Sequence, residues 1–322
     1  MKYIRLYTTD PYYNLAVEEY LFRHAEDDVF MLWQNEPSVI VGKNQNTYAE
    51  VNLDYARESG INVCRRITGG GAVYHDLGNI NYTFISTRGD TRALDFELFT
   101  RPIRHALKRL GVECSVSARN DIECRGAKFS GNAQYSLGGR ILHHGTLLFD
   151  TDFSVMERVL RVDKEKLTHH AVKSCRSRVV NLSELLAERI TLGDFLSEIE
   201  ASVCAELSAV SEELPKGAEI AALCERNRSS AWIYSEKRFL TDYSVERQKK
   251  YPFGLVKMQL MLEGGIIRRA TVSGDFFGTA PIEELERMLE GRSPADIPEI
   301  DPSPYIGGMS YPELKELLLG LA

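Results

Sequence analysis

The chain has 322 residues, enough for two compact units of ordinary domain size. Apolar residues make up 43% and charged residues 26%, a globular composition that excludes collagen-like, coiled-coil and disordered chains. The formal charge is −7, from 39 basic and 46 acidic residues, and there is no long basic run. We therefore expect no binding to nucleic acid through its phosphate backbone.

The cysteines and the N-terminal sequence favour a reducing compartment. The six cysteines are scattered without a CxxC pair, so neither a zinc site nor a disulfide framework is indicated. The N-terminal residues contain no apolar signal-peptide core, and no segment approaches the roughly 20 apolar residues of a membrane span. We expect a cytoplasmic protein that does not contact a membrane.

The first 150 residues predict alternating strands and helices. Residues 3–7 read as a strand, and Asp10-Pro11 supplies the cap and first-turn proline of a helix to about residue 23. Two apolar runs, 29–33 and 38–41, flank Asn-Glu-Pro and predict a hairpin. The remaining predicted elements are helices over 52–59 and 95–110, and strands over 61–66, 81–86 and, with glycine turns, 121–150.

The later part of the chain changes texture near residue 250. From 153 to about 230 the apolar spacing is helical, including segments 182–188 and 192–207. Strict alternation over 256–262, a Gly-Gly turn and a second strand over 266–272 then predict a hairpin, followed by helices near 281–290 and 311–319. We place a domain boundary in the polar segment 244–250, which divides the chain into residues 1–245 and 246–322.

The strongest local signal is the segment RRITGGGAVYHD, which begins at Arg65. Three successive glycines let the backbone approach a ligand closely, and Arg66 adds a planar donor fork for phosphate or carboxylate. A flexible turn between two strands is the alternative interpretation. Neither a Walker A motif nor a GxGxxG fingerprint is present, so the segment alone indicates no more than an anion or nucleotide loop.

A second signal is Lys128, which lies between glycines in GAKFSGNAQ, shortly after Asp121. Most lysines are solvated surface charges. A lysine held beside an acyl phosphate, however, could neutralise the charge that develops during adenylation.

Two further segments allow more than one reading. His143 and His144 begin an apolar strand, so their side chains should point to opposite faces and cannot easily chelate one ion; each could bind backbone or a ligand. The basic, hydroxyl-rich residues 174–181 form either a solvated loop with Asn181 as a helix cap or a segment that closes over phosphates.

In combination, these segments resemble the lipoate–protein ligase family. The similarity runs in order through RRITGGGAVYHDLGNINYTF, ARNDIECRGAKFSGNAQY, ILHHGTLLFDTD and KSCRSRVVNL, and GLVKMQLMLEGGIIRRATVSGDFF resembles the family's small accessory domain. The resemblance implies an α/β fold: a mixed-sheet catalytic domain, as in class II aminoacyl-tRNA synthetases and biotin ligases, and a small α/β C-terminal domain. The interleaved arginines of the biotin ligase glycine loop are absent.

The resemblance also implies a reaction. Family members activate lipoate with ATP and Mg²⁺ to lipoyl-AMP and pyrophosphate. They then transfer the acyl group to a lysine of a lipoyl domain, in the E2 subunits of 2-oxoacid dehydrogenases or the glycine cleavage H protein.

By position, the resemblance assigns roles to individual residues of this chain. Lys128 is implied as the catalytic residue, and Asp121 as a residue that steadies Mg²⁺. The ATP and adenylate contacts implied are Arg66, Gly71, Ala72, Val73, Tyr74 and Lys128. The lipoyl contacts implied are Arg66, Gly70, His75, Lys128, Ala133 and His144.

Two other functions remain open from the residues. An amidotransferase of the same fold could move a lipoyl or octanoyl group without ATP, and those that use an acyl-cysteine would need a nucleophile such as Cys124 or Cys175, both close to the motifs. A non-catalytic lipoate- or nucleotide-binding regulator is the other alternative, against which Lys128 argues.

Overall fold

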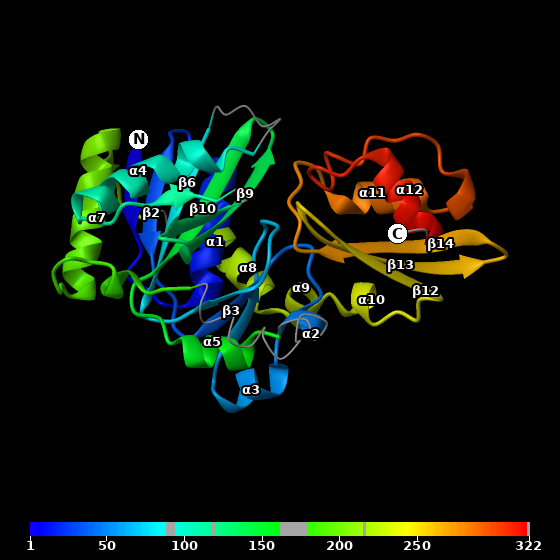
Figure 1. The fold of residues 1–322 in the computed structure, drawn as a ribbon, viewed down its shortest axis with the longest axis horizontal. Coiled ribbons are helices and arrows are strands. Elements are labelled where there is room, and N and C mark those ends of the chain that lie inside the picture. The colour runs from blue at the N-terminus through cyan, green and yellow to red at the C-terminus, as the bar shows by residue number, and fades with distance from the viewer. Residues whose placement is uncertain (88–93, 118–119, 162–178, 215–216, 321–322) are drawn as a thin grey trace.

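The computed structural model describes residues 1–87, 94–117, 120–161, 179–214 and 217–320. Two bodies lie side by side, the larger built on an eight-stranded sheet and the smaller on a three-stranded sheet (Figure 1). Within the described residues, no helix is both long and apolar enough to cross a bilayer.

The main sheet of the larger body is mixed. Strands β11, β1 and β2 are parallel to one another, and every later neighbour is antiparallel. The predicted α/β class is thereby confirmed. In spatial order the strands are β11 (Val210–Ser211), β1 (Lys2–Arg5), β2 (Val29–Trp33), β6 (Asn79–Ser86), β10 (Arg140–Leu148), β9 (Ala127–Leu137), β8 (Asp121–Cys124) and β7 (Ser115–Val116).

Helices cover both faces of this sheet. Helices α4 (Phe96–Arg109) and α7 (Leu192–Leu207) pack on one face, and α1 (Pro11–His24) and α8 (Ala218–Arg228) on the other (Figure 1). Phe30 of β2 joins the first core and Met31 the second. A strand buried on both sides is apolar throughout, which explains the run VFMLW.

A second, three-stranded sheet lies beside the main one and corrects the predicted hairpin. It consists of β4 (Asn62–Arg65), β3 (Ser38–Val41) and β5 (Val73–His75), with β3 in the centre. Strands β2 and β3 therefore belong to different sheets, and the prediction that they form a hairpin is wrong. Apolar runs identify strands but not partners. Asn35, which we placed in the turn, is fully buried and bonds to Asn14 and His75.

Most predicted helices are confirmed. Asp10 caps α1 by accepting from the Tyr12 and Tyr13 amides, as the Asp-Pro pair indicated. The predicted helix over 182–188 is only a 3₁₀ turn, η2 (Leu182–Glu184). The other short elements of this body are α2 (Thr47–Glu50), α3 (Leu53–Glu58) and α5 (Phe153–Val159).

The smaller body is a three-stranded antiparallel sheet with helices on one face (Figure 1). The polar segment in which we placed the domain boundary is the edge strand β12 of this body, whose side chains alternate between half-buried and exposed. An edge strand with one face in water carries many charged residues, which is why the segment did not predict a strand. The boundary near residue 245 stays a prediction. The elements are β12 (Val245–Tyr251), β13 (Gly254–Glu263), β14 (Ile266–Gly274), α11 (Ile282–Leu289), η3 (Pro294–Asp296) and α12 (Tyr311–Leu319).

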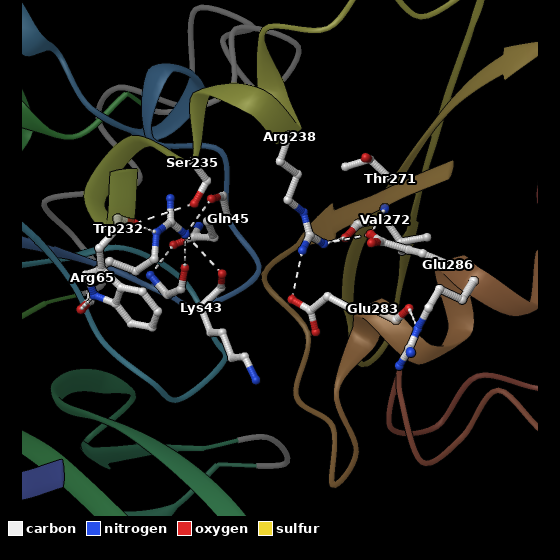
Figure 2. A network of polar contacts seen from close by, with 12 residues as sticks. Lys43, Gln45, Arg65, Trp232, Ser235, Arg238, Thr271, Val272, Glu283 and Glu286 are labelled. Carbon is white, nitrogen blue, oxygen red and sulfur yellow. Dashed lines mark hydrogen bonds and ion pairs between the residues drawn. The ribbon is translucent and has the colours of Figure 1, made fainter. Parts of the chain in front are cut away.

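Two short helices, α9 (Ser230–Tyr234) and α10 (Glu236–Phe239), connect the bodies, and each is held by an arginine (Figure 2). Arg65 of the larger body donates to the Trp232 and Ile233 carbonyls of α9 at 3.0 and 2.8 Å. Arg238 of α10 donates to Glu286 at 2.7 Å and to the Val272 carbonyl at 2.9 Å, both in the smaller body. Helix α9 is therefore attached to one body and α10 to the other.

Buried His143 predicts an acid-dependent loss of stability. Its ring is enclosed by Tyr82, Phe96 and Phe99, and burial lowers its pKa to about 3. Below the unfolded pKa of about 6.5 the unfolded chain binds a proton that the folded chain does not, so the free energy of unfolding decreases as the pH is lowered. Between pH 7.5 and 5 this one group should cost about 2 kcal/mol.

Urea unfolding of wild type and His143→Phe at several pH values checks this expectation. The variant's free energy of unfolding should fall less between pH 7.5 and 5, by about the amount that one histidine contributes. Equal pH slopes in the two proteins would contradict a neutral, buried His143.

Candidate active site

One cavity lies on the face of the main sheet that α1 covers, next to the glycine loop, and it brings together most of the predicted site residues. Tyr74 and Asp121 are outside its lining: the Tyr74 side chain packs in the core of the small sheet, and Asp121 contacts Lys128. The predicted residues that line the cavity are Arg66, Gly70, Gly71, Ala72, Val73, His75, Lys128, Ala133 and His144.

Arg66 organises the glycine loop from inside. Its Nη2 donates to the Gly69 and Gly71 carbonyls at 2.6 and 2.8 Å, its Nη1 to Ile40 O at 2.9 Å, and its Nε to Thr68 Oγ1 at 2.8 Å. Burial lowers the pKa of the guanidinium to about 10, which leaves it charged at neutral pH. Three of these four hydrogen bonds hold the loop segment, and the fourth ties it to strand β3.

The glycine loop is packed, so the interpretation as a free turn is wrong. The Gly70 amide donates to Phe276 O of the smaller body at 3.2 Å. A Cβ at Gly69 would lie 2.4 Å from that same oxygen, and one at Gly42 would lie 2.1 Å from Gly70 O. Backbone approaches this close admit only glycine. The loop is therefore held between the large body and the small one.

Lys128 lies at the start of β9, where its ammonium forms an ion pair with Asp121 at 2.7 Å. About a third of its side chain is exposed. Gly131 makes room for it, because a Cβ there would lie 2.9 Å from Lys128 Nζ. A cation is therefore fixed in the wall of the cavity, close to the entry of solvent.

His144 belongs to a continuous buried chain of hydrogen bonds. Its Nδ1 contacts Glu18 Oε1 and its Nε2 contacts Thr68 Oγ1, both at 2.9 Å. The Glu18 carboxylate accepts from Nδ1–H, Nε2 shares a hydrogen bond with the Thr68 hydroxyl, and the Thr68 oxygen accepts from Arg66 Nε. The chain links helix α1 to the glycine loop. His143 points to the opposite face, as predicted.

Several lining residues were missed from the sequence. Leu15, Trp33 and Ile40 supply apolar surface from three separate elements, and Asn81 and Thr146 add polar atoms. Glu18 does not line the cavity but supports it through His144, with a side chain that is only 1% exposed. No local sequence signal distinguishes it from a surface glutamate.

Part of one prediction falls outside the described residues. Of residues 174–181, only 179–181 are described: Val180 N donates to Lys128 O at 2.9 Å, and the Asn181 amide bonds to both backbone atoms of Thr151. Cys175 also lies outside them. Cys124 is packed in the core under the main sheet.

The described residues contain no group of three or more histidine, cysteine or acidic side chains suited to a metal ion. Asp121 offers a single carboxylate, one oxygen of which faces Lys128. Such a donor fits Mg²⁺ in the way this ion is commonly bound, through one or two carboxylates together with substrate phosphates and water.

Comparison with known proteins identifies the family. Residues 10–204 match the profile described as "Lipoyl protein ligase A/B catalytic domain", and residues 241–318 match "Bacterial lipoate protein ligase C-terminus". The chain is 39% identical over 289 residues to lipoate-protein ligase LplJ of Bacillus subtilis, covering 88% of this chain and 87% of the relative. The chain belongs to the lipoate–protein ligase family. It is therefore an enzyme of the ligase class, as the resemblance implied.

Other members of the family agree in extent and fold. Lipoate–protein ligase 1 of Staphylococcus aureus is 38% identical over 288 residues, which span 88% of this ligase and 87% of that protein. The crystal structure of Plasmodium falciparum LipL1 in complex with lipoate superposes with a TM-score of 0.79 at 23% identity, covering 99% of this chain and 98% of that one. The fold of this chain is thus shared along nearly its whole length by that structure.

The packing of the glycine loop gives a matched pair of substitutions in this ligase. Gly69→Ala should push Phe276 away and weaken the contact between the bodies, whereas Gly71→Ala meets no atom closer than 4.0 Å. We expect Gly69→Ala to lower the melting temperature by several degrees and Gly71→Ala to change it little.

Thermal unfolding and small-angle scattering of both variants check the pair. The radius of gyration should increase for Gly69→Ala alone. If both variants resemble wild type in both measurements, the contact between the loop and Phe276 does not hold the bodies together.

Proposed function

We propose that this ligase activates lipoate with ATP to lipoyl-AMP and pyrophosphate, then transfers the lipoyl group to a lysine of a lipoyl domain. The observation that carries the proposal is the position of Lys128: a cation held by an ion pair in the wall of the cavity, beside the glycine loop. The acceptors we propose are the E2 subunits of 2-oxoacid dehydrogenases and the glycine cleavage H protein.

Related structures support the substrates and the partner. One similar structure is a lipoate-protein ligase A bound with ATP, at 24% identity and a TM-score of 0.59, covering 75% of this chain and 96% of that one. Another, from Thermoplasma acidophilum, is a bipartite ligase with its E2 lipoyl domain, at 26% identity and a TM-score of 0.63.

The chemistry requires two displacements. A free carboxylate resists attack by an amine, so it is first converted to a mixed anhydride with AMP. The Lys128 ammonium, placed between the lipoate carboxyl oxygen and the α-phosphate, would stabilise the negative charge in both steps. The target lysine, whose usual pKa of about 10.4 keeps it protonated at neutral pH, must first lose a proton; its free amine then attacks the acyl carbon, and the bond from that carbon to the phosphate oxygen breaks to release AMP.

The other predicted residues take supporting roles in this proposal. Arg66 keeps the loop in shape, so that Gly71, Ala72, Val73 and Tyr74 present backbone to the adenylate. On the acyl side we propose Gly70, His75, Ala133 and His144, all of which line the cavity. Asp121 would hold Mg²⁺ together with the phosphates, and the ion would neutralise the triphosphate and its leaving group.

An ATP-independent amidotransferase remains the second candidate from the sequence. The route through an acyl-cysteine finds little support, because within the described residues the lining of the cavity contains no cysteine. Lipoate-dependent exchange of labelled pyrophosphate into ATP separates the two reactions, since only adenylation incorporates the label.

Lys128→Ala tests the role of the cation. We expect exchange to fall by roughly 10²-fold or more, and transfer from supplied lipoyl-AMP to slow by a similar factor, because one charge serves both steps. Lys108→Ala, which removes an exposed lysine of α4, is the matched control. Near-normal exchange in a folded Lys128→Ala protein would rule out the proposed role.

Asp121→Asn tests the metal separately. If Asp121 holds Mg²⁺, the variant should need a several-fold higher Mg²⁺ concentration for half-maximal exchange. It should also react nearly normally with supplied lipoyl-AMP, which needs no pyrophosphate to leave. If the Mg²⁺ requirement is unchanged and both steps slow equally, Asp121 acts only through Lys128.

A further inference from the structure

The cavity has a defined long axis across the main sheet. Trp33 of β2 is paired with Asn81 of β6, and Asn81 with Thr146 of β10. The Thr146 hydroxyl in turn accepts from Gly131 N of β9, next to the Lys128 ammonium. Three steps between neighbouring strands, each about 4.8 Å, separate the two ends by about 14 Å. Trp33 therefore marks the end opposite Lys128.

An acyl substrate has one orientation in such a cavity. If the carboxyl group lies at Lys128, as the proposed function requires, the far end of the acyl chain lies near Trp33. That end is lined by apolar groups, but it also contains the imidazole of His75, whose ring centroid is 6.3 Å from that of Trp33.

The proton on His75 can be located from its neighbours. Asn14 Nδ2 contacts the carbonyls of Thr8 and Gln34 at 3.0 and 2.8 Å, which fixes it as nitrogen. Asn35 Oδ1 lies 3.0 Å from the same nitrogen, whose two hydrogens are shared among the three oxygens; an Asn35 nitrogen at that place would set N–H against N–H, so the atom is the oxygen. The remaining atom, Asn35 Nδ2, then donates to His75 Nδ1 at 3.1 Å.

His75 is therefore neutral with its proton on Nε2. Burial lowers its pKa to about 3, so the ring carries one proton, and Nδ1 is occupied as an acceptor. Nε2 is buried and has no hydrogen-bond partner among the described residues. Asn81 Nδ2 is likewise buried and has no hydrogen-bond partner among the described residues, while Asn81 Oδ1 accepts from Asn79 Nδ2.

These two N–H donors, which lack a partner within the described part of the chain, belong to side chains that line one cavity, and leaving them unsatisfied is costly. A buried donor without an acceptor loses its hydrogen bond to water and gains nothing in return. The cost is recovered when a ligand supplies an acceptor at that place. A saturated acyl chain supplies none, whereas the ring of lipoate supplies two sulfur atoms, which are weak acceptors.

We infer that His75, together with Asn81, selects lipoate over an unsubstituted fatty acid by donating hydrogen bonds to the dithiolane sulfurs. Asn35 is a positioning residue that fixes the tautomer, and Asn14 fixes Asn35. The inference rests on the proposed function for the direction in which the acid lies. It assigns substrate selection to a polar contact at the far end of the cavity, in addition to its apolar fit.

A double comparison of protein and ligand isolates this contact. Binding of lipoate and of 5-cyclopentylpentanoate, which has a ring of the same size without sulfur, is measured by calorimetry in wild type and in His75→Phe. Wild type should prefer lipoate over the analogue by about three- to tenfold more than the variant does, as expected for one net hydrogen bond. His75→Gln, which keeps an N–H donor, should restore part of the preference.

His143→Phe is the matched control, because it makes the same substitution at a buried histidine on the other face of the sheet. It should keep the wild-type preference. If His75→Phe keeps it as well, the inference is wrong. Pyrophosphate exchange driven by lipoate and by octanoate provides a second ratio, which should fall in the same variant.

Nitrogen NMR of the histidine rings tests the tautomer without depending on His75→Phe. In wild type His75 should be protonated on Nε2 and remain so down to about pH 5. Asn35→Leu, which removes the donor to Nδ1, should reduce that population and the preference for lipoate together. A proton on Nδ1 in wild type would overturn the inference.

The two proposals can fail separately. If wild type shows no pyrophosphate exchange that depends on lipoate or octanoate, ATP-dependent activation is contradicted, whatever the binding ratios are. Normal exchange with equal ratios in wild type and His75→Phe would contradict only the role of His75.

Discussion

Two adjacent guanidinium groups, Arg65 and Arg66, are buried at the end of strand β4, and the rest of the site depends on how their charge is accommodated. Burial lowers the pKa values to about 9 and about 10, so both remain cationic near neutral pH. Their partners within the described residues are carbonyl and hydroxyl oxygens. A cation surrounded by carbonyls fixes the backbone that supplies them, because losing even one leaves a buried charge undersatisfied.

Neighbouring positions on a strand point to opposite sides, so the pair divides the work. Arg66 donates hydrogen bonds to carbonyls of the glycine loop. Arg65 donates hydrogen bonds to the carbonyls of Gly42, Lys43, Gln45 and helix α9. Two adjacent side chains therefore fix the loop and the connection to the smaller body. Figure 2 shows the contacts that Arg65 and Arg238 make along this connection. A change in the contact between the bodies is then felt at the loop, because Gly70 bonds to Phe276 directly.

The fold was largely predictable because its signals are local. The Asp10-Pro11 cap, the alternation in β13 and the helical spacing of α4 each identify an element from a few residues. Pairing is a different matter: β2 and β3 are both apolar runs, and nothing between them shows that they join separate sheets. Strand β12 was not predicted because it is an edge strand facing water, and its many charged residues hide the apolar alternation of a strand.

Site residues that stand in an unusual local sequence could be predicted, whereas those brought to the site only by the fold could not. Lys128 and the triple glycine stand in unusual local sequences, so they could be singled out. Glu18, Asn35 and Asn81 are ordinary polar residues in the sequence, and only burial gives them meaning.

The two histidines of the cavity show how the same side chain can serve opposite purposes. Both nitrogens of His144 are bonded within the protein, so this ring contributes to the rigidity of the loop and offers a ligand little beyond its surface. His75 has one nitrogen fixed by Asn35, and its other nitrogen has no hydrogen-bond partner among the described residues, so the protein holds the ring in place without using that donor. Groups left unsatisfied in the folded state lower its stability. His75 and Asn81 both line the cavity, so a ligand that accepts from their N–H groups would recover that cost.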